Sequence, residues 1–149
     1  MTMAKKKTEI RRGIPSHQWL SRTLIESPIH YALCLNEKQF YEEMARLKVP
    51  KHQYPSFLGA HGHAATHHIE FKGKPVSIVC LGSQEGRTEW EVLGLLVHEA
   101  VHIWQEMCLN IGEREPSAEF EAYSVQWIAQ ELMRAWNHGR GRSIQYHSK

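Results

Sequence analysis

Two histidines and a glutamate stand at H-E-x-x-H spacing in the chain: His98, Glu99 and His102. Residues four apart on an α-helix lie about 40° apart around its axis and roughly 6 Å apart along it, so both imidazoles can reach one ion. Glu99 lies about 100° round from His98, where it can act on a water molecule without binding the metal itself. The pattern predicts a catalytic Zn²⁺ site in which Glu99 is the general base.

The residues around this motif predict the helix that it requires. Thr88 is suited to cap a helix from about Glu89 to Leu109, and apolar residues lie on nearly every face of that helix. We therefore expect the helix in the middle of the domain, open only where it meets a cleft. The alternative without metal is a pair of hydrogen-bonded core histidines, with Glu99 in an ion pair.

A catalytic zinc needs a third protein ligand, and the composition limits the choice. All 16 acidic residues are glutamate, so no aspartate ligand exists, and Cys108 has no glycine before it to turn the chain back towards the metal. Glu119 and Glu121 lie on the next predicted helix about 200° apart, so only one of them can face the metal. The aromatic residues expected to face inward there are Phe120, Tyr123 and Trp127. Glu119 precedes Tyr123 by four residues, which favours Glu119 and leaves Glu121 as the alternative.

The two segments H-E-A-V-H (98–102) and E-F-E-A-Y (119–123) resemble the paired motifs of small gluzincin metallopeptidases. They are similar to those of the ImmA/IrrE-like group and, more distantly, of membrane-bound zincin peptidases and SprT-like proteins. In those families the first glutamate of the second motif binds zinc, which implies Glu119 here. The related motifs carry Asn or Asp where this chain has Tyr123. The resemblance also implies a zincin-like fold, in which the strand before the active helix edges the cleft and pairs with an extended peptide; Pro75–Leu81 is the matching segment.

The reaction implied is the hydrolysis of a protein or peptide substrate with Zn²⁺ as cofactor. His98, His102 and Glu119 would hold the zinc, and Glu99 would take a proton from water and pass it to the leaving amine. The candidate donors to the developing oxyanion are Tyr123, Tyr146 and His138. A further group of histidines in the segment 61–68 would form a second metal site or line the cleft, although a glycine-rich loop running into a strand explains it without metal.

The remaining pattern predicts a single α+β domain of order β-α-β-β-α-α, with a small mixed sheet packed on a central H-E-x-x-H helix and a C-terminal helix. The expected elements are a strand over 29–35, a helix over 37–48 capped by Asn36, a loop over 51–65, a hairpin of His67–Phe71 and Pro75–Leu81, the helix of the motif, and a last helix from Ser117 to about Asn137.

Charge divides the chain into an acidic body and two basic ends, although the formal net charge is only +2. We expect a flexible basic N-terminus over residues 1–16, one catalytic domain over 17–137 and a flexible basic tail over 138–149. The ends offer weak contact with nucleic acid, but the full basic footprint of a nucleic-acid-binding domain is missing.

Three widely spaced cysteines predict reduced thiols, and the chain has neither an apolar leader nor a stretch long enough to span a bilayer. We therefore expect a cytoplasmic protein without a membrane partner. Two other functions compete with the peptidase. One is a non-proteolytic, zinc-stabilised binding module for a protein or nucleic-acid partner. The other is a metal amidase such as peptide deformylase, whose Asp in the metal motif and E-G-C-L-S segment are absent here.

Overall fold

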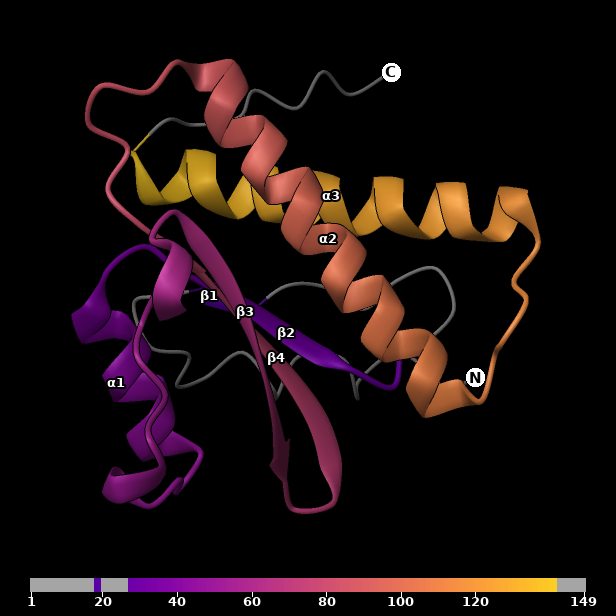
Figure 1. Cartoon of the computed structure of the whole chain (residues 1–149), viewed down its shortest axis with the longest axis horizontal. Coiled ribbons are helices and arrows are strands. Elements are labelled where there is room, and N and C mark those ends of the chain that lie inside the picture. Colours follow the sequence, from indigo (N-terminus) through magenta and orange to yellow (C-terminus); the bar gives the residue numbers. More distant parts are fainter. Residues whose placement is uncertain (1–17, 20–26, 142–149) are drawn as a thin grey trace, which may run out of the picture.

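The computed structural model describes residues 18–19 and 27–141, and its elements follow the predicted order (Figure 1). The elements are β1 (Gln18–Trp19), β2 (His30–Cys34), α1 (Glu37–Arg46), β3 (Ala64–Phe71), β4 (Lys74–Leu81), α2 (Glu89–Ile111) and α3 (Ala118–Gly139). Two short 3₁₀ segments, Lys51–Gln53 and Gly59–His61, lie between α1 and β3. The predicted α+β class is confirmed, and β1 is an addition to the predicted order.

The strands form one mixed sheet in the order β1-β2-β4-β3. β2 runs parallel to β4, whereas β1 and β3 are antiparallel to their neighbours. The predicted hairpin is confirmed, but β3 begins at Ala64, inside the segment predicted as loop. The prediction that Pro75–Leu81 edges the cleft is wrong, because β4 pairs with a strand on each side. Within the described part of the chain, β3 is the edge strand beside α2.

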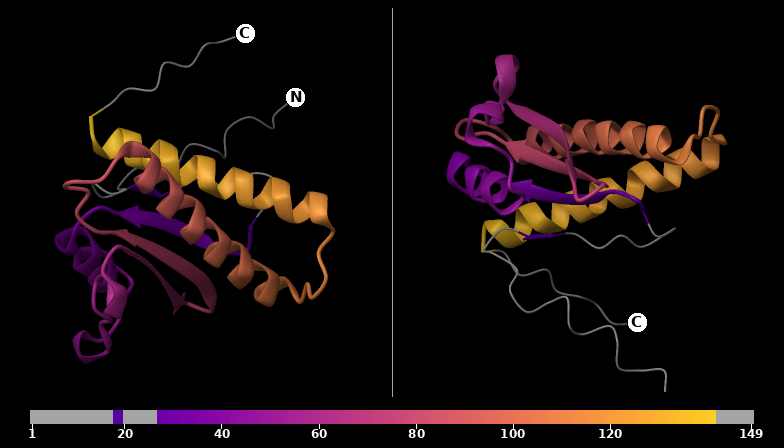
Figure 2. Two further views of the ribbon diagram at one scale, coloured as in Figure 1. Left: turned by 45° about the horizontal axis from the view of Figure 1, so that its top comes forward. Right: turned by 90° about the horizontal axis from the view of Figure 1, so that it is seen from below.

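The alternation of side chains along the strands divides the core between the two faces of the sheet. The helices α2 and α3 lie alongside each other, and α1 lies apart from them (Figure 2). Tyr31, Leu33, Val79 and Leu81 pack with α2 and α3 on one face. On the other face, β2 and β4 contribute a second set that packs with α1: Ala32, Cys34, Val76, Ile78 and Cys80. α2 lies over β3 and β4, and α3 contacts β2. This arrangement brings the H-E-x-x-H helix beside the open edge of the sheet.

Both ends of α2 are fixed by local signals that the sequence carries. The Thr88 hydroxyl accepts a hydrogen bond from the backbone N–H of Glu91, and the Glu91 carboxylate accepts one from the backbone N–H of Thr88, which completes a capping box. Gly112 ends the helix in the left-handed conformation with φ 72°. The predicted helix is confirmed and runs two residues further, to Ile111.

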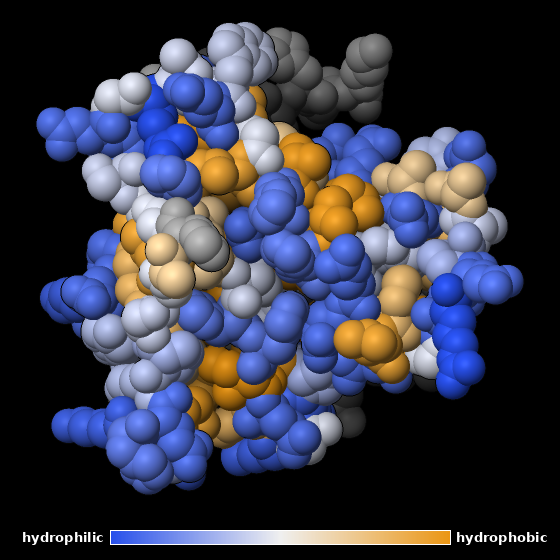
Figure 3. Space-filling view, in the orientation of Figure 1, coloured by the Kyte–Doolittle hydropathy of each residue, from blue (hydrophilic) through white to orange (hydrophobic). Residues whose placement is uncertain are grey.

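The expectation that α2 is surrounded on nearly all sides is wrong. Its buried residues face the sheet and α3, but Trp90, Val97 and Leu109 are exposed by 80%, 40% and 77%. Figure 3 looks onto the face that carries α2 and shows separate apolar groups among hydrophilic side chains. The helix therefore keeps one long open side, and the H-E-x-x-H histidines lie along it.

α3 begins where predicted, with the Ser117 hydroxyl accepting a hydrogen bond from the backbone N–H of Phe120, and it continues to Gly139. Its buried residues are Ser124, Ile128, Ala129, Glu131, Leu132, Ala135 and Trp136. The predicted inward face is wrong at Tyr123, whose side chain is 58% exposed. The helix runs two residues past its predicted end at Asn137, into the segment predicted as a tail, and the predictions for residues 1–16 and 142–149 lie outside the described part of the chain.

The three cysteines are free, with Cys34 and Cys80 buried and Cys108 half-buried, as expected for reduced thiols. Burial raises the pKa of the Cys34 thiol to about 12, with the carboxylates of Glu43 and Glu42 adding to the shift. None of the described helices has the length and apolar character to cross a membrane.

Candidate metal centre

His98 and His102 lie on the open side of α2 with their rings facing each other. The two Nε2 atoms are 3.1 Å apart, and the rings meet edge to face with centroids 4.8 Å apart. The Nδ1 atom of His102 is 3.3 Å from the Gln105 side-chain oxygen, so that contact turns its Nε2 towards His98. The predicted juxtaposition of the two imidazoles is thus present in the structure.

This pair fits a tetrahedral metal ion. With Zn–N bonds of about 2.0–2.1 Å, two ligands of one tetrahedral zinc are about 3.3 Å apart, close to the observed separation of the two Nε2 atoms. A third donor is not in place: among the described residues, no three His, Cys or Glu side chains are grouped so as to hold a metal ion. The two histidines could therefore supply two of the three protein ligands that a catalytic zinc needs.

Glu99 lies about 100° round α2 from His98 and points towards the sheet. Its side chain is 3% exposed, and its Oε2 atom accepts a hydrogen bond of 2.6 Å from the Thr66 hydroxyl on β3. A buried carboxylate without such a donor would be costly, so Thr66 stabilises Glu99 in this position. Thr66 therefore anchors the predicted base to the edge strand, in the turn of α2 that also carries His98.

Alternation along β3 separates the histidines that the sequence groups together. Thr66 and His68 face α2, whereas His67 faces α1, where its ring packs 5.0 Å from that of Phe40 and its Nε2 contacts the Phe57 carbonyl oxygen at 3.1 Å. His67 and His68 therefore cannot share a metal ion. His63 contacts Arg87 instead, so the described members of this group form no second metal site.

His68 is an exposed imidazole that the sequence did not single out for the centre. Its Nδ1 atom lies 2.8 Å from the hydroxyl of Ser77, the residue directly opposite on β4. Desolvation against its neighbours lowers the pKa of His68, and among the charges acting on it Glu106 and Glu99 oppose the shift while His102 adds to it. His68 thus lies within electrostatic range of the H-E-x-x-H residues.

The choice between Glu119 and Glu121 depends on which face of α3 meets α2. Ile128 is buried in the core shared with α2, and Glu121 lies seven residues before it, on nearly the same face. Glu119 lies nine residues before Ile128, which is about 180° round, and it is exposed. The structure therefore turns Glu121 towards α2 and Glu119 away from it.

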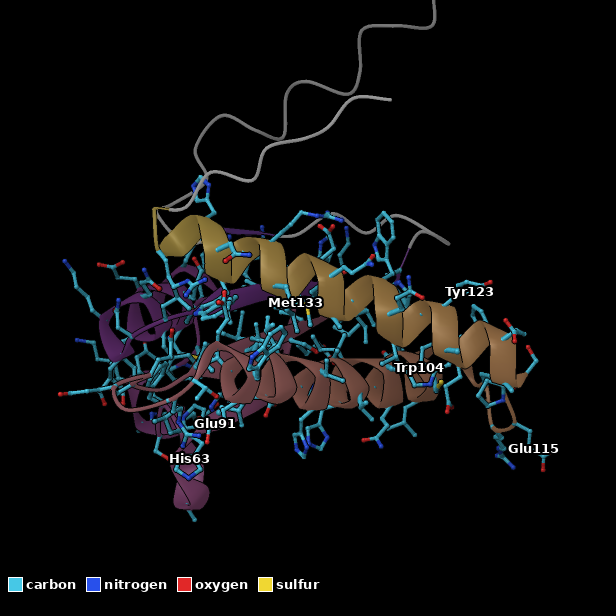
Figure 4. The ribbon with its side chains drawn as sticks, turned by 90° about the horizontal axis from the view of Figure 1, so that it is seen from above. His63, Glu91, Trp104, Glu115, Tyr123 and Met133 are labelled. Atoms are coloured by element: carbon cyan, nitrogen blue, oxygen red, sulfur yellow. The ribbon has the colours of Figure 1, made fainter. Side chains whose placement is uncertain are left out.

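Glu121 does not reach the histidine pair in this structure. Its Oε2 atom accepts a hydrogen bond of 3.2 Å from the Trp104 indole N–H, and Trp104 lies between α2 and α3 (Figure 4). Six residues separate Trp104 from His98, which places the indole about 120° round α2 from that histidine. Glu121 also lines an open hollow of about 360 Å³ together with Gln105, the residue that contacts His102.

None of the predicted oxyanion donors lies beside the pair within the described residues. Tyr123 is on the side of α3 that faces away from α2 (Figure 4), and His138 is exposed in the last turn of the same helix. Tyr146 lies outside the described part of the chain. Sequence reasoning did not name Thr66, and it named His68 only as one member of the histidine group in the segment 61–68. The signal that sets these two residues apart is the two-residue alternation of the strand directly before the hairpin turn.

No protein-family description, curated protein or solved structure matches the chain.

Proposed function

We propose that the chain is a zinc-dependent metallopeptidase of gluzincin type with a zincin-like fold. The observation that carries the proposal is the pair of facing Nε2 atoms of His98 and His102, 3.1 Å apart on the open side of a helix beside an edge strand. Two neutral imidazoles at this separation share one N–H···N hydrogen bond, and the same separation suits two nitrogens that bind one tetrahedral metal ion.

His98 and His102 would hold the zinc, with a carboxylate of α3 as third donor. We take Glu121 as that donor in place of Glu119, because it lies on the α2-facing side and lines the hollow next to Gln105. To bind a metal ion, the Glu121 carboxylate would have to give up the hydrogen bond that it accepts from the Trp104 indole N–H. A bound zinc ion would lower the pKa of a water molecule and would polarise the carbonyl group of the substrate.

The chain's own residues then carry out the proton transfer and hold the substrate. Glu99 takes a proton from the attacking water and delivers it to the leaving amine, and the Thr66 hydroxyl keeps its carboxylate in one orientation. The edge of β3 that is unpaired within the described residues is suited to add an extended peptide as a further strand, which would hold the scissile bond alongside α2. This role passes to β3 from β4, because β4 has no free edge.

The three free cysteines support the cytoplasmic location that belongs to this proposal.

The test is metal content together with cleavage of a proteome-derived peptide library. We expect about one zinc per chain, loss of zinc in His98→Ala, and retention of zinc in Glu99→Gln with cleavage reduced by roughly 10²–10⁴-fold. Glu106→Gln makes the same chemical change on the same helix and should leave cleavage intact. A zinc-loaded protein that cleaves no peptide would favour the non-proteolytic binding module, and a protein that binds no zinc would exclude both functions.

A further inference from the structure

His68 lies near the candidate centre, and the proposed function gives it no role. It faces α2 from β3, two residues beyond Thr66, which holds Glu99. The charges of Glu106, His102 and Glu99 act on its ring, as expected for a side chain that faces this part of α2. A peptide added along the edge of β3 would run beside that strand and next to α2, because β3 is the edge strand within the described residues and contacts α2.

The contact with Ser77 determines which nitrogen of His68 carries the proton. Ser77 is fully buried, and within the described residues His68 Nδ1 is the one hydrogen-bond partner of its hydroxyl. A buried hydroxyl that donates to nothing is costly. The Ser77 O–H therefore donates to Nδ1, which leaves the proton of the neutral ring on Nε2.

A neutral imidazole with its proton on Nε2 is a hydrogen-bond donor at that atom. It has no lone pair there for a metal ion, in keeping with the absence of a three-membered ligand group among the described side chains. The charged or titratable groups that act on the ring are Glu106, His102, His67 and Glu99, and desolvation outweighs them and lowers the pKa of His68. The ring thus stays neutral at neutral pH and does not need to be charged to donate.

We propose that His68 is a catalytic residue that donates a hydrogen bond from Nε2 to the carbonyl oxygen of the scissile peptide bond as negative charge develops on it. Ser77 is a positioning residue that sets the tautomer and orientation of the ring. The inference rests on the proposed peptidase function and names the oxyanion donor of that site. Donors of this kind strengthen their bond in the transition state and lower the barrier without tightening ground-state binding.

The first experiment needs neither metal nor substrate. Two-bond ¹H–¹⁵N correlation spectra of the metal-free protein report the tautomer of each histidine. We expect His68 to show a protonated Nε2 and an unprotonated Nδ1 at neutral pH, and Ser77→Ala to shift the ring towards a mixture of tautomers. A His68 ring protonated on Nδ1 in the wild type would overturn the proposal.

The second experiment compares His68→Ala with Glu70→Gln, a control on the same face of the same strand. With the peptide that the wild type cleaves best, we expect His68→Ala to lower kcat by about 10²–10³-fold, with KM within a few-fold and zinc content unchanged. A phosphinic peptide, which mimics the tetrahedral transition state, should bind more weakly to His68→Ala by a similar factor. Ser77→Ala should give a smaller loss, and Glu70→Gln none.

The outcomes separate this inference from the proposed function. A cleaving wild type whose His68→Ala variant keeps kcat within threefold would overturn the role of His68 and leave the peptidase standing. Loss of zinc in His68→Ala would show that the residue is a ligand, which also overturns the proposal. A zinc-loaded wild type that cleaves nothing would overturn both the peptidase and the role of His68.

Discussion

The hydrogen bond between Thr66 and Glu99 can be tested through stability alone, in the metal-free protein. Thr66→Val keeps the shape of the side chain and removes the hydroxyl that donates to Glu99 Oε2 at 2.6 Å. Glu99 is 3% exposed, and Thr66 is the one hydrogen-bond partner of its carboxylate within the described residues. The substitution therefore leaves a buried carboxylate unsatisfied.

Hydrogen bonds to charged groups contribute about 1.5–3 kcal/mol, so we expect Thr66→Val to lower the free energy of unfolding by that amount. At this chain length each kcal/mol shifts Tm by about 2–4 °C, which gives a decrease of about 3–12 °C. The assay is urea unfolding followed by circular dichroism, with Thr66→Ser as a control that keeps the hydroxyl. In a double-mutant cycle with Glu99→Met, the coupling energy should exceed about 1 kcal/mol. Equal stabilities of the Val and Ser variants, with a coupling energy near zero, would refute the anchoring of Glu99 by β3.

Three further predictions follow from other parts of the fold. The backbone N–H and hydroxyl of Thr88 lower the pKa of Glu91 below its ordinary value of 4.5, so its contribution to stability is present above that value and is lost as the pH falls through the lower, folded-state pKa. The Tm difference between wild type and Glu91→Gln should therefore narrow between pH 6 and pH 3, and a constant difference would contradict the capping box. In the native protein at pH 8, a thiol reagent should modify half-buried Cys108 first, because the thiols of β2 and β4 are buried and their pKa values are raised; mass spectrometry of the labelled peptides decides the order. Leu132→Ala, at a fully buried position, should cost about 2–5 kcal/mol in urea unfolding, whereas Leu109→Ala, at a position 77% exposed, should cost less than about 0.5 kcal/mol; similar costs would contradict the packing of α3.

Helix boundaries were predictable because their signals are local. Asn36 and Thr88 each accept a hydrogen bond from a backbone N–H at the start of a helix, as the sequence predicts, and the last helix begins directly after Ser117, where its start was predicted. The H-E-x-x-H geometry was predictable for the same reason, since helical spacing alone brings His98 and His102 together.

The predictions that failed concern features that depend on contacts between residues far apart in the sequence. The parallel pairing of β2 with β4 places β4 inside the sheet, and no short-range sequence pattern predicts a pairing between strands that are separated by α1, a long connection and β3. β3 is an edge strand with partly exposed residues on both faces, so its hydrophobic alternation is weak and its start at Ala64 was missed.

The inward face of α3 was misassigned because large aromatic side chains were taken as core. Tyr123 is exposed, whereas Ser124 and Ile128 are buried. Tyr123 lies five residues before Ile128 and therefore about 140° round α3, so a core centred on Tyr123 favours Glu119 whereas the observed core favours Glu121. The angle at which α3 crosses α2 decides which residues of α3 are buried against it, so residue type alone does not predict them.

The most direct test of the metal centre is anomalous diffraction at the zinc edge from crystals grown with zinc. We expect one strong peak about 2.0–2.1 Å from the Nε2 atoms of both His98 and His102, with the carboxylate of Glu121 on α3 as the third protein ligand. A peak bound by other residues, or no peak at this pair in crystals that contain zinc, would contradict the proposed metal centre.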